Sequence, residues 1–342
     1  MGTREVRVSV KSGRSKLVKW DDLRMEIISN PTHNEIKQAA KALKDGHLVA
    51  FPTETVYGLG ADATNRKAVN RIYSVKGRPI GHPLIVHISS INQLDYWAIE
   101  IPHYAIKLAE EFWPGPMTLI LKKTNLAKNF VTGGQNSIGL RVPNEQVALS
   151  LLLEFEKLGG LGVSAPSANK FNAVSPTTAQ AVKEEIGEYL ESEDLILNGG
   201  QSSIGIESTI IDCTGTVPTV LRPGFVTVNQ LKKITKQSNS NFLEQQIKFS
   251  GNFKKHYSPR AKVLLDVEPI HGQAFIALSS VPTPKNVIRI ASPKNGVEFA
   301  HILYESLRLV DRNGIAELVI HQPLGEGIAA AVRDRLEKAG NT

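Results

Sequence analysis

The segment THNEIKQAAKALKDGHLVAFPTETVYG, residues 32–58, indicates an α/β fold. Thr32 and Glu35 form a capping box, apolar residues follow at helical spacing, and Gly46 supplies a stop, so the pattern predicts a helix. The apolar run at residues 48–51 predicts a strand, which ends at a loop with three hydroxyl side chains. Because ligands of open α/β sheets gather just past strand ends, this loop is a candidate binding segment.

Helical and strand patterns continue to alternate and predict an α/β domain over residues 26–235. Its further predicted helices lie at residues 68–73, closed by Gly77, and at 147–155 and 178–186, and its further strands at 84–88, 117–121, 139–142, 162–165, 195–197, 207–212 and 219–222. Trp113-Pro114-Gly115-Pro116 predicts a tight turn.

Three other regions flank this domain. Residues 1–25 form a basic N-terminal extension, and residues 236–261 form a polar linker that ends in His256-Tyr257-Ser258-Pro259. Residues 262–342 predict a smaller α/β domain. Its predicted strands lie at 263–265, 275–278, 287–290 and 318–320, and its predicted helices at 297–312 and 327–338.

The composition is that of a globular cytoplasmic protein. Hydrophobic residues make up 41% and charged residues 21% of the 342 residues, and no apolar run reaches the roughly 18 residues that a membrane helix needs. The basic N-terminal segment contains no apolar core of a secretory signal. The single cysteine, Cys213, cannot form an internal disulfide or a zinc cluster, and we expect it to be a small core residue. We therefore expect a cytoplasmic protein without membrane contact.

The net charge of +7 allows two interpretations: a general attraction to nucleic acid, or a cationic pocket for a phosphorylated ligand. Residues 64–94 contain no Asp or Glu and include Lys76-Gly77-Arg78-Pro79. Lys76 offers a mobile point charge and Arg78 a planar fork, and the adjacent glycine and proline restrain the backbone. This pattern favours a shaped site for an anion such as a triphosphate over a solvated helix face. The sequence has no G-x-x-x-x-G-K-[ST] loop, so side chains would have to replace its backbone cradle.

Other common site patterns are missing from the sequence. Gly58-Leu59-Gly60-Ala61-Asp62-Ala63 fits G-x-G-x-x-A, but no acidic residue follows about 20 positions on, which argues against a nicotinamide cofactor. We interpret these glycines as a close backbone turn. The nine histidines form no H-E-x-x-H or i, i+4 pair, so we expect no built-in metal site. His87 at a strand end is either a core histidine or a ligand residue.

Polar side chains recur near the predicted strand ends. Ser164-Ala165-Pro166-Ser167-Ala168-Asn169, Ser175-Pro176-Thr177-Thr178, Gly205-Ile206-Glu207-Ser208-Thr209 and Leu221-Arg222-Pro223-Gly224 each carry a weak signal, because hydroxyl groups often only cap helices or tighten turns. Together they predict a polar, cationic cavity.

These residues resemble a known family, the threonylcarbamoyl-AMP synthases of the YrdC/Sua5 family. The resemblance covers, in family order, residues 51–59, the Lys76-x-Arg78 pair with His82-Pro83-Leu84, residues 113–116, Arg141-Val142-Pro143, Ser167-x-Asn169, Ser175-Pro176-Thr177, Glu207-Ser208-Thr209 and residues 221–224. The His-Tyr-Ser-Pro linker and the second α/β domain are similar to the longer Sua5 branch. The resemblance implies a YrdC-like twisted open mixed sheet with helices and a large cationic cavity, plus a smaller Rossmann-like C-terminal α/β domain.

The resemblance also implies a reaction, in which L-threonine, bicarbonate and ATP give threonylcarbamoyl-AMP, pyrophosphate and water. This adenylate would serve the t6A modification of tRNA, at adenosine 37 of ANN-decoding tRNAs. Threonine's amine would capture CO2, and the carbamate oxygen would attack the α-phosphorus of ATP. Such chemistry needs positioning and charge neutralisation rather than a nucleophilic side chain. Mg2+ would enter with ATP and would be held largely by phosphate oxygens.

Residue by residue, the resemblance implies two groups of contacts. Those expected around L-threonine are Thr55, His87, Arg141, Ala165 and Ser208, with Arg141 on the carboxylate. Those expected around ATP are Lys76, Arg78, His82, Ser137, Ser167, Asn169, Ser175, Arg222 and Tyr257. Lys76, Arg78 and Arg141 are the expected catalytic residues. His82 and Ser137 stand where relatives often carry Asn and Thr.

Two other functions stay open at this stage. A cationic surface with a basic N-terminal arm also suits an RNA-binding protein, although aromatic residues are only 6% and form no stacking motif. A carbamoyl transferase of the hydrogenase-maturation type shares this domain, but its zinc-finger cysteines are missing from the sequence. The C-terminal domain could hold the linker, regulate access or meet the downstream threonylcarbamoyl transferase. Direct tRNA binding also stays open, and we expect a monomer.

Overall fold

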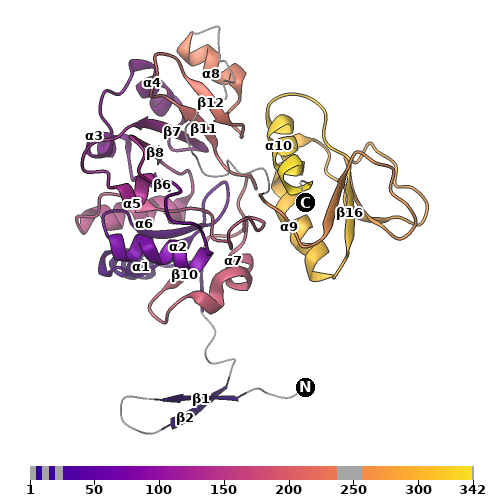
Figure 1. Ribbon diagram of the computed structural model, residues 1–342, viewed down its shortest axis with the longest axis horizontal. Helices are drawn as coiled ribbons and strands as arrows, with labels where there is room; N and C mark the ends of the chain where they lie inside the picture. The colour runs from indigo at the N-terminus through magenta and orange to yellow at the C-terminus, as the bar shows by residue number, and fades with distance from the viewer. Residues whose placement is uncertain (1–4, 10–14, 20–25, 237–255, 341–342) are drawn as a thin grey trace.

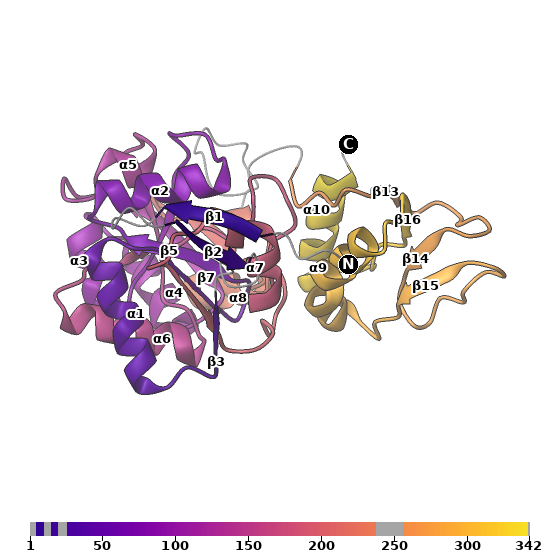
Figure 2. The ribbon, with the colours of Figure 1, turned by 90° about the horizontal axis from the view of Figure 1, so that it is seen from below.

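The computed structural model describes residues 5–9, 15–19, 26–236 and 256–340. The predicted extension at 1–25 and the predicted linker at 236–261 therefore lie largely outside the described residues. Figures 1 and 2 show a larger N-terminal body and a smaller C-terminal body side by side. Between 5 and 19, strands β1 (Glu5–Ser9) and β2 (Ser15–Lys19) pair antiparallel, a hairpin that the sequence did not predict.

The larger body is built on a mixed sheet of ten strands. In spatial order they are β12 (Thr219–Arg222), β11 (Thr209–Asp212), β7 (Met117–Lys122), β8 (Ser137–Arg141), β6 (Ile85–His87), β9 (Val163–Ser164), β5 (Gly58–Asp62), β4 (Val49–Phe51), β10 (Leu195–Asn198) and β3 (Ile27–Ser29). Strands β6 and β8 run parallel, whereas β7 and β8 run antiparallel. The predicted α/β fold with a mixed sheet is confirmed.

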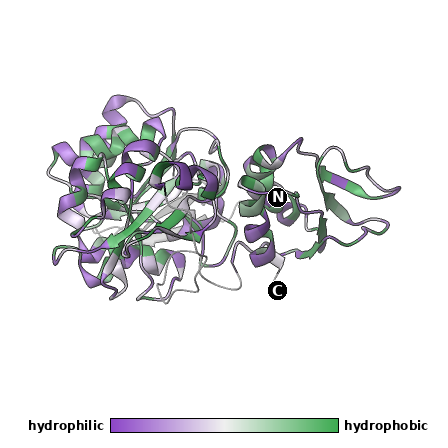
Figure 3. Cartoon of the chain, turned by 90° about the horizontal axis from the view of Figure 1, so that it is seen from above, coloured by the Kyte–Doolittle hydropathy of each residue, from purple (hydrophilic) through white to green (hydrophobic). Residues whose placement is uncertain are grey.

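Two hydrophobic cores lie on opposite faces of this sheet. Residues alternate in direction along a strand, so Val49 and Phe51 of β4 join one core while Leu48 and Ala50 join the other. The first core includes helices α1 (His33–Asp45) and α6 (Gln146–Lys157). The second includes α2 (Arg66–Lys76), α4 (His103–Phe112), α7 (Ala179–Ile186) and α8 (Val228–Thr235). Short helical turns are η2 (Ile91–Gln93), α3 (Leu94–Trp97), α5 (Asn129–Thr132) and η3 (Gly187–Tyr189). Figure 3 shows the hydrophobic strands inside and hydrophilic residues on the outer helices.

The helix start and end signals predicted from the sequence are confirmed for α1 and α2. Thr32 and Glu35 form the expected capping box of α1, and Gly46 ends that helix with φ 96°. Gly77 ends α2 in the same left-handed conformation, which turns the chain between Lys76 and Arg78.

Cys213 is fully buried, as expected. No helix among the described residues has both the length and the hydrophobicity to cross a bilayer.

The smaller body is a four-stranded parallel sheet in the order β13 (Lys262–Leu265), β16 (Glu317–Ile320), β14 (Ala274–Ile276) and β15 (Ile288–Ala291). Its helices α9 (Gly296–Arg312) and α10 (Ile328–Gly340) lie between this sheet and the larger body (Figures 1 and 2). All six elements occur where the sequence predicted them, within about two residues.

One sequence interpretation was wrong. Gly58–Asp62 is strand β5 and not a turn. A Cβ on Gly60 would lie 2.8 Å from Phe51 and 2.9 Å from Val163. These two residues belong to β4 and β9, the strands that pair with β5 on either side. The glycines therefore permit close packing inside the sheet. Strand β3 and helices α4 and α8 were also absent from the sequence prediction.

We expect Gly60→Ala to lower the free energy of unfolding by about 1–3 kcal/mol, because the added methyl group overpacks the core. Gly187→Ala is the matched control, since its Cβ would meet only Lys183 at 3.4 Å. Chemical denaturation of both variants tests this. Equal stability of the two variants would contradict the close packing at Gly60.

Candidate active site

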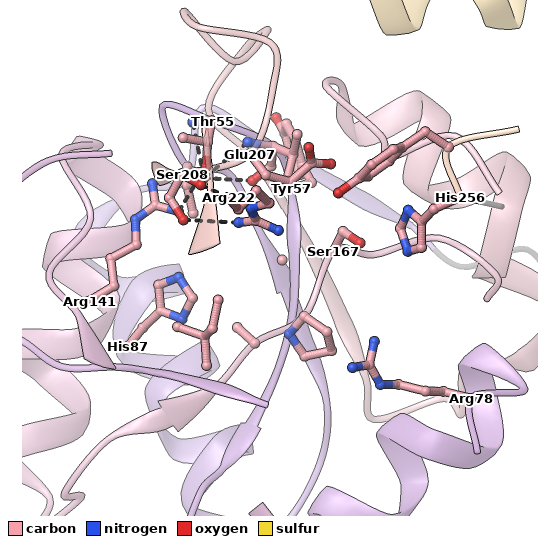
Figure 4. Close-up of a pocket in the computed structure, with 17 residues that line it drawn as sticks. Thr55, Tyr57, Arg78, His87, Arg141, Ser167, Glu207, Ser208, Arg222 and His256 are labelled. Atoms are coloured by element: carbon pink, nitrogen blue, oxygen red, sulfur yellow. Dashed lines mark hydrogen bonds between the residues drawn. The ribbon is translucent and has the colours of Figure 1, made fainter. Parts of the chain in front are cut away.

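A cavity with an empty volume of about 560 Å3 lies where strand ends of the larger body meet the segment that leads into the smaller body. Its lining residues are Thr53, Thr55, Val56, Tyr57, Gly58, Arg78, Ile85, His87, Arg141, Ala165, Pro166, Ser167, Glu207, Ser208, Arg222, His256 and Tyr257. Figure 4 shows Arg141 and His87 at one end and Arg78 with His256 at the other.

Strand ends create this convergence. His87 ends β6 and Arg141 ends β8, and the two residues are register partners in this parallel pair. Parallel strands present corresponding ends at the same sheet edge, so both side chains reach the same cavity. Arg222 likewise ends β12, and Ser208 directly precedes β11.

Arg141 is a buried cation, with 4% of its surface exposed. Its Nη2 lies 2.7 Å from Glu54 Oε1, its Nη1 donates to Thr55 Oγ1 at 2.9 Å, and its Nε donates to the Gly115 carbonyl at 3.3 Å. A guanidinium has five N–H donors, and hydrogen bonds within the described residues use two of them, so Arg141 can still donate to a ligand. Glu54 thus fixes the orientation of Arg141, a role that the sequence prediction did not assign.

His87 is neutral at pH 7. Burial, aided by the charge of Arg141, lowers the pKa of His87 to about 3. Its Nδ1 is buried and has no hydrogen-bond partner in the described part of the chain. It can therefore accept or donate a hydrogen bond to a bound molecule without adding charge.

Ser208 and Arg222 form a fixed pair between the two ends of the cavity. Arg222 donates from Nε to the Ser208 carbonyl at 3.0 Å and from Nη2 to Ser208 Oγ at 3.1 Å. Ser208 Oγ also lies 2.8 Å from Thr118 Oγ1 on β7. A residue predicted for ATP and one predicted for threonine are thus in direct contact.

Lys76 and Arg78 have different positions although both are buried. Burial lowers the pKa of Arg78 to about 10, so it stays charged on the cavity wall. Lys76 lies behind the wall, where its Nζ donates to the carbonyls of Ser167 and Asn169 at 2.5 and 2.6 Å. Burial and then the charge of Arg78 lower the pKa of Lys76 well below its ordinary value. In this structure Lys76 orders the loop that presents Ser167.

Four other predicted ATP residues do not line the cavity. Asn169 donates to the carbonyls of Lys170 and Ala173, and Ser175 donates to Glu207. The His82 ring lies 6.3 Å from the ring of Phe171. Ser137 begins β8, and at about 3.3 Å per residue it lies roughly 13 Å along the strand from Arg141. Their contacts with ATP stay predictions.

Glu207 was quoted in a motif but received no role from the sequence. Its Oε1 accepts from Ser175 at 2.7 Å, and its Oε2 accepts from Tyr304 and Arg335 of the smaller body, each at 2.9 Å. Burial alone would raise the pKa of Glu207, but the charges of Arg335 and Arg222 outweigh it and lower the pKa to about 2. The carboxylate is therefore ionised, and both of its oxygens accept hydrogen bonds from the protein. The only sequence feature that could have indicated a role for Glu207 was its position next to Ser208.

His256 and Tyr257 bring the segment before β13 to the cavity wall. Their rings are in edge contact, with centroids 4.0 Å apart. Burial, with the charges of Lys76, Arg78 and Arg222, lowers the pKa of His256 to about 3. The Tyr257 hydroxyl is buried and without a hydrogen-bond partner among the described residues, which leaves it free to contact a ligand.

Comparison with known proteins shows the family to which the chain belongs. The Telomere recombination family (Sua5, YciO and YrdC) matches residues 41–224, and the threonylcarbamoyl-AMP synthase C-terminal domain family matches residues 226–341. The chain belongs to the threonylcarbamoyl-AMP synthase family. The predicted Sua5-type resemblance is thereby confirmed.

Several members of this family are similar to the chain over most of its length. Threonylcarbamoyl-AMP synthase of Pyrococcus abyssi is 35% identical, covering 89% of this chain and 94% of the relative. The Bacillus subtilis protein of the same name is 34% identical, covering 89% and 92%. The structure of P. abyssi Sua5 complexed with L-threonine matches with a TM-score of 0.81 and 33% identity, covering 92% of this chain and 98% of that chain.

We expect Glu207→Gln to lower the free energy of unfolding at pH 7 by about 2 kcal/mol, because it removes one of the two carboxylates that pair with the buried Arg335 guanidinium and leaves only Asp334. The folded pKa of Glu207 lies below its ordinary 4.5, so its contribution is present above pH 4.5 and is lost as pH falls towards 2. The stability gap between wild type and variant should therefore narrow below pH 4.5. Denaturation at several pH values measures it, and a constant gap would contradict the ion pair.

Proposed function

We propose that this chain is an L-threonylcarbamoyladenylate synthase, which forms threonylcarbamoyl-AMP, pyrophosphate and water from L-threonine, bicarbonate and ATP. The observation that carries the proposal is the pairing of two anion sites in one cavity. Arg141 is held by Glu54 and Thr55 at one end, and Arg78 lies with Ser167 at the other. The names of similar proteins across archaea and bacteria support the same enzyme class.

The threonine end would bind the amino acid through its carboxylate. Arg141 has unused N–H donors there, and the surrounding wall is formed by Thr55, His87, Ala165 and Ser208. Charged hydrogen bonds between guanidinium and carboxylate are strong and directional. P. abyssi Sua5 has been solved with L-threonine, which supports this part of the proposal.

The chemistry requires two bond-forming steps. Bicarbonate takes up a proton and loses water to give CO2, and the threonine nitrogen bonds to its carbon and releases a proton. A carbamate oxygen then bonds to the α-phosphorus of ATP, and the bond from that phosphorus to the bridging oxygen breaks, so pyrophosphate leaves with the electron pair. The protein positions these groups and offsets the developing phosphate charge with Arg78 and Arg222.

Mg2+ would arrive on the triphosphate. The described residues contain no group of three His, Cys, Asp or Glu side chains placed to hold a metal ion. Glu207, which lines the cavity, already accepts three side-chain hydrogen bonds. Phosphate oxygens and water suit Mg2+ well, and the ion would neutralise charge on the leaving pyrophosphate.

The remaining ATP contacts would come from Lys76, His82, Ser137, Asn169, Ser175 and Tyr257. Lys76 would act indirectly, through the carbonyls of the loop that carries Ser167. The product would serve t6A modification of tRNA in the cytoplasm, where a downstream threonylcarbamoyl transferase would receive it. The match of residues 226–341 to the synthase C-terminal domain favours this function over RNA binding and over hydrogenase-type carbamoyl transfer.

We expect pyrophosphate release from ATP and Mg2+ to require both L-threonine and bicarbonate, with the adenylate detected by mass spectrometry. The Lys76→Ala/Arg78→Ala variant should lose at least about a hundredfold in rate, because it removes the Arg78 charge from the cavity wall and the Lys76 contacts that order the Ser167 loop. Hydrolysis independent of threonine would reject the proposal. RNA and carbamoyl phosphate would then be tested as ligands.

We also expect Arg141→Ala to weaken L-threonine binding by about a hundredfold and ATP binding by about threefold or less, because the ligand contact that it removes is the one to the threonine carboxylate. Arg78→Ala is the matched control, a buried arginine at the other end of the cavity, and should show the reverse pattern. Calorimetry with each ligand measures both. Equal losses for the two ligands in Arg141→Ala would refute the assignment.

A further inference from the structure

Arg335 on α10 is a fully buried charge at the contact between the two bodies. Its Nε donates to Glu207 Oε2 at 2.9 Å and its Nη2 to the Glu207 carbonyl at 3.5 Å. Its guanidinium carbon lies 5.4 Å from the ring centroid of Tyr257, within the range of a cation–π contact. One side chain from the smaller body thus contacts two lining residues of the cavity.

Tyr304 on α9 contacts the same two residues. Its hydroxyl donates to Glu207 Oε2 at 2.9 Å, and its ring stacks on that of Tyr257 with centroids 5.8 Å apart and planes at 24°. Tyr257 therefore contacts both Tyr304 and Arg335. Neither of these two residues lines the cavity, so both act through others.

The charge of Glu207 explains how these contacts can affect ligand binding. Glu207 is an ionised carboxylate on the wall of a cavity proposed to receive a triphosphate. Uncompensated, it would repel the ligand, and in a buried site this repulsion is weakly screened. Arg335 and Tyr304 offset that charge from behind, while the unpartnered Tyr257 hydroxyl stays on the wall.

A second ion pair at the contact between the bodies lies away from the cavity. It allows a role in docking the bodies to be compared with a role in positioning the cavity wall. Arg312 on α9 donates to Glu184 on α7 at 2.8 Å, and both side chains are about 40% exposed and away from the cavity wall. Docking alone is served by such a pair and by apolar contacts. Arg308 on α9 is also buried at this contact, where it pairs with Glu185 at 2.9 Å away from the cavity wall, so burial alone does not distinguish the two roles. Arg335 differs from both arginines because the residues that it contacts, Glu207 and Tyr257, line the cavity.

We propose that Arg335 and Tyr304 are positioning residues for the ATP end of the cavity, which they organise by holding Tyr257 and offsetting Glu207. The smaller body thereby contributes directly to nucleotide affinity. The inference rests on the proposed synthase function and adds a role for the C-terminal domain.

The test compares Arg335→Met with Arg312→Met in the full chain, by steady-state kinetics and by calorimetry with ATP. We expect Arg335→Met to raise the KM and Kd for ATP about tenfold, the effect of one charge-assisted hydrogen bond, with the KM for threonine changed less than about threefold. Arg312→Met should leave both KM values within about twofold. Adding Glu207→Gln to Arg335→Met should recover part of the ATP affinity, since it removes the uncompensated charge.

A residue that only maintained the fold would reduce the active fraction, lowering kcat with both KM values unchanged. That result for Arg335→Met would overturn the proposal. If Arg335→Met does not fold, Tyr304→Phe removes one hydroxyl and should raise the KM for ATP about threefold, and an unchanged KM there would likewise overturn it. A wild-type protein that makes no adenylate would reject the synthase function instead, and ATP binding by calorimetry would still report on the positioning.

Discussion

The buried carboxylate of Glu207 is the interaction on which the relation between the two bodies depends. A buried charge is tolerated only when it is paired and hydrogen-bonded, and here the partners come from three separate places in the sequence. Ser175 belongs to the loop before α7, Tyr304 to α9 and Arg335 to α10. Satisfying one carboxylate therefore fixes both helices of the smaller body against the sheet that carries the cavity.

The cavity follows a similar rule for cations. Arg141 is balanced by Glu54, whereas Lys76 is held by backbone carbonyls. The first arrangement pairs a cation with a carboxylate, whereas the second holds the Lys76 nitrogen near the cavity through backbone carbonyls alone. This difference suits a site that binds a singly charged carboxylate at one end and a polyanion at the other.

Local signals in the sequence predicted most elements. Capping at Thr32, the stop at Gly77 and the apolar periodicity of α9 and α10 depend on neighbours along the chain, and such signals are strong. The interpretation of Gly58–Asp62 failed because glycine in a strand and glycine in a turn look alike until the covering residues are known.

The candidate site was likewise only partly predictable from the sequence. Motifs indicated a cationic, hydroxyl-rich cavity, and the family resemblance suggested which residues belong to each ligand. The roles of Glu54 and Glu207 could not be predicted, because they depend on partners far away in sequence, up to 128 residues for Arg335. Nor could the separation of Ser137 from Arg141 at opposite ends of β8, which depends on which strand end faces the cavity.

The register of β6 with β8 restricts how this protein can change over evolution. His87 and Arg141 occupy paired positions, and side chains along a strand alternate between faces. Inserting one residue between Ser137 and Arg141 would send the guanidinium to the opposite face, and inserting two would displace it by about 6.6 Å. Length variation should therefore concentrate in segments such as the turn between β11 and β12, which joins an antiparallel pair away from the cavity wall. Strands β6 and β8 can therefore vary in residue composition but hardly in length.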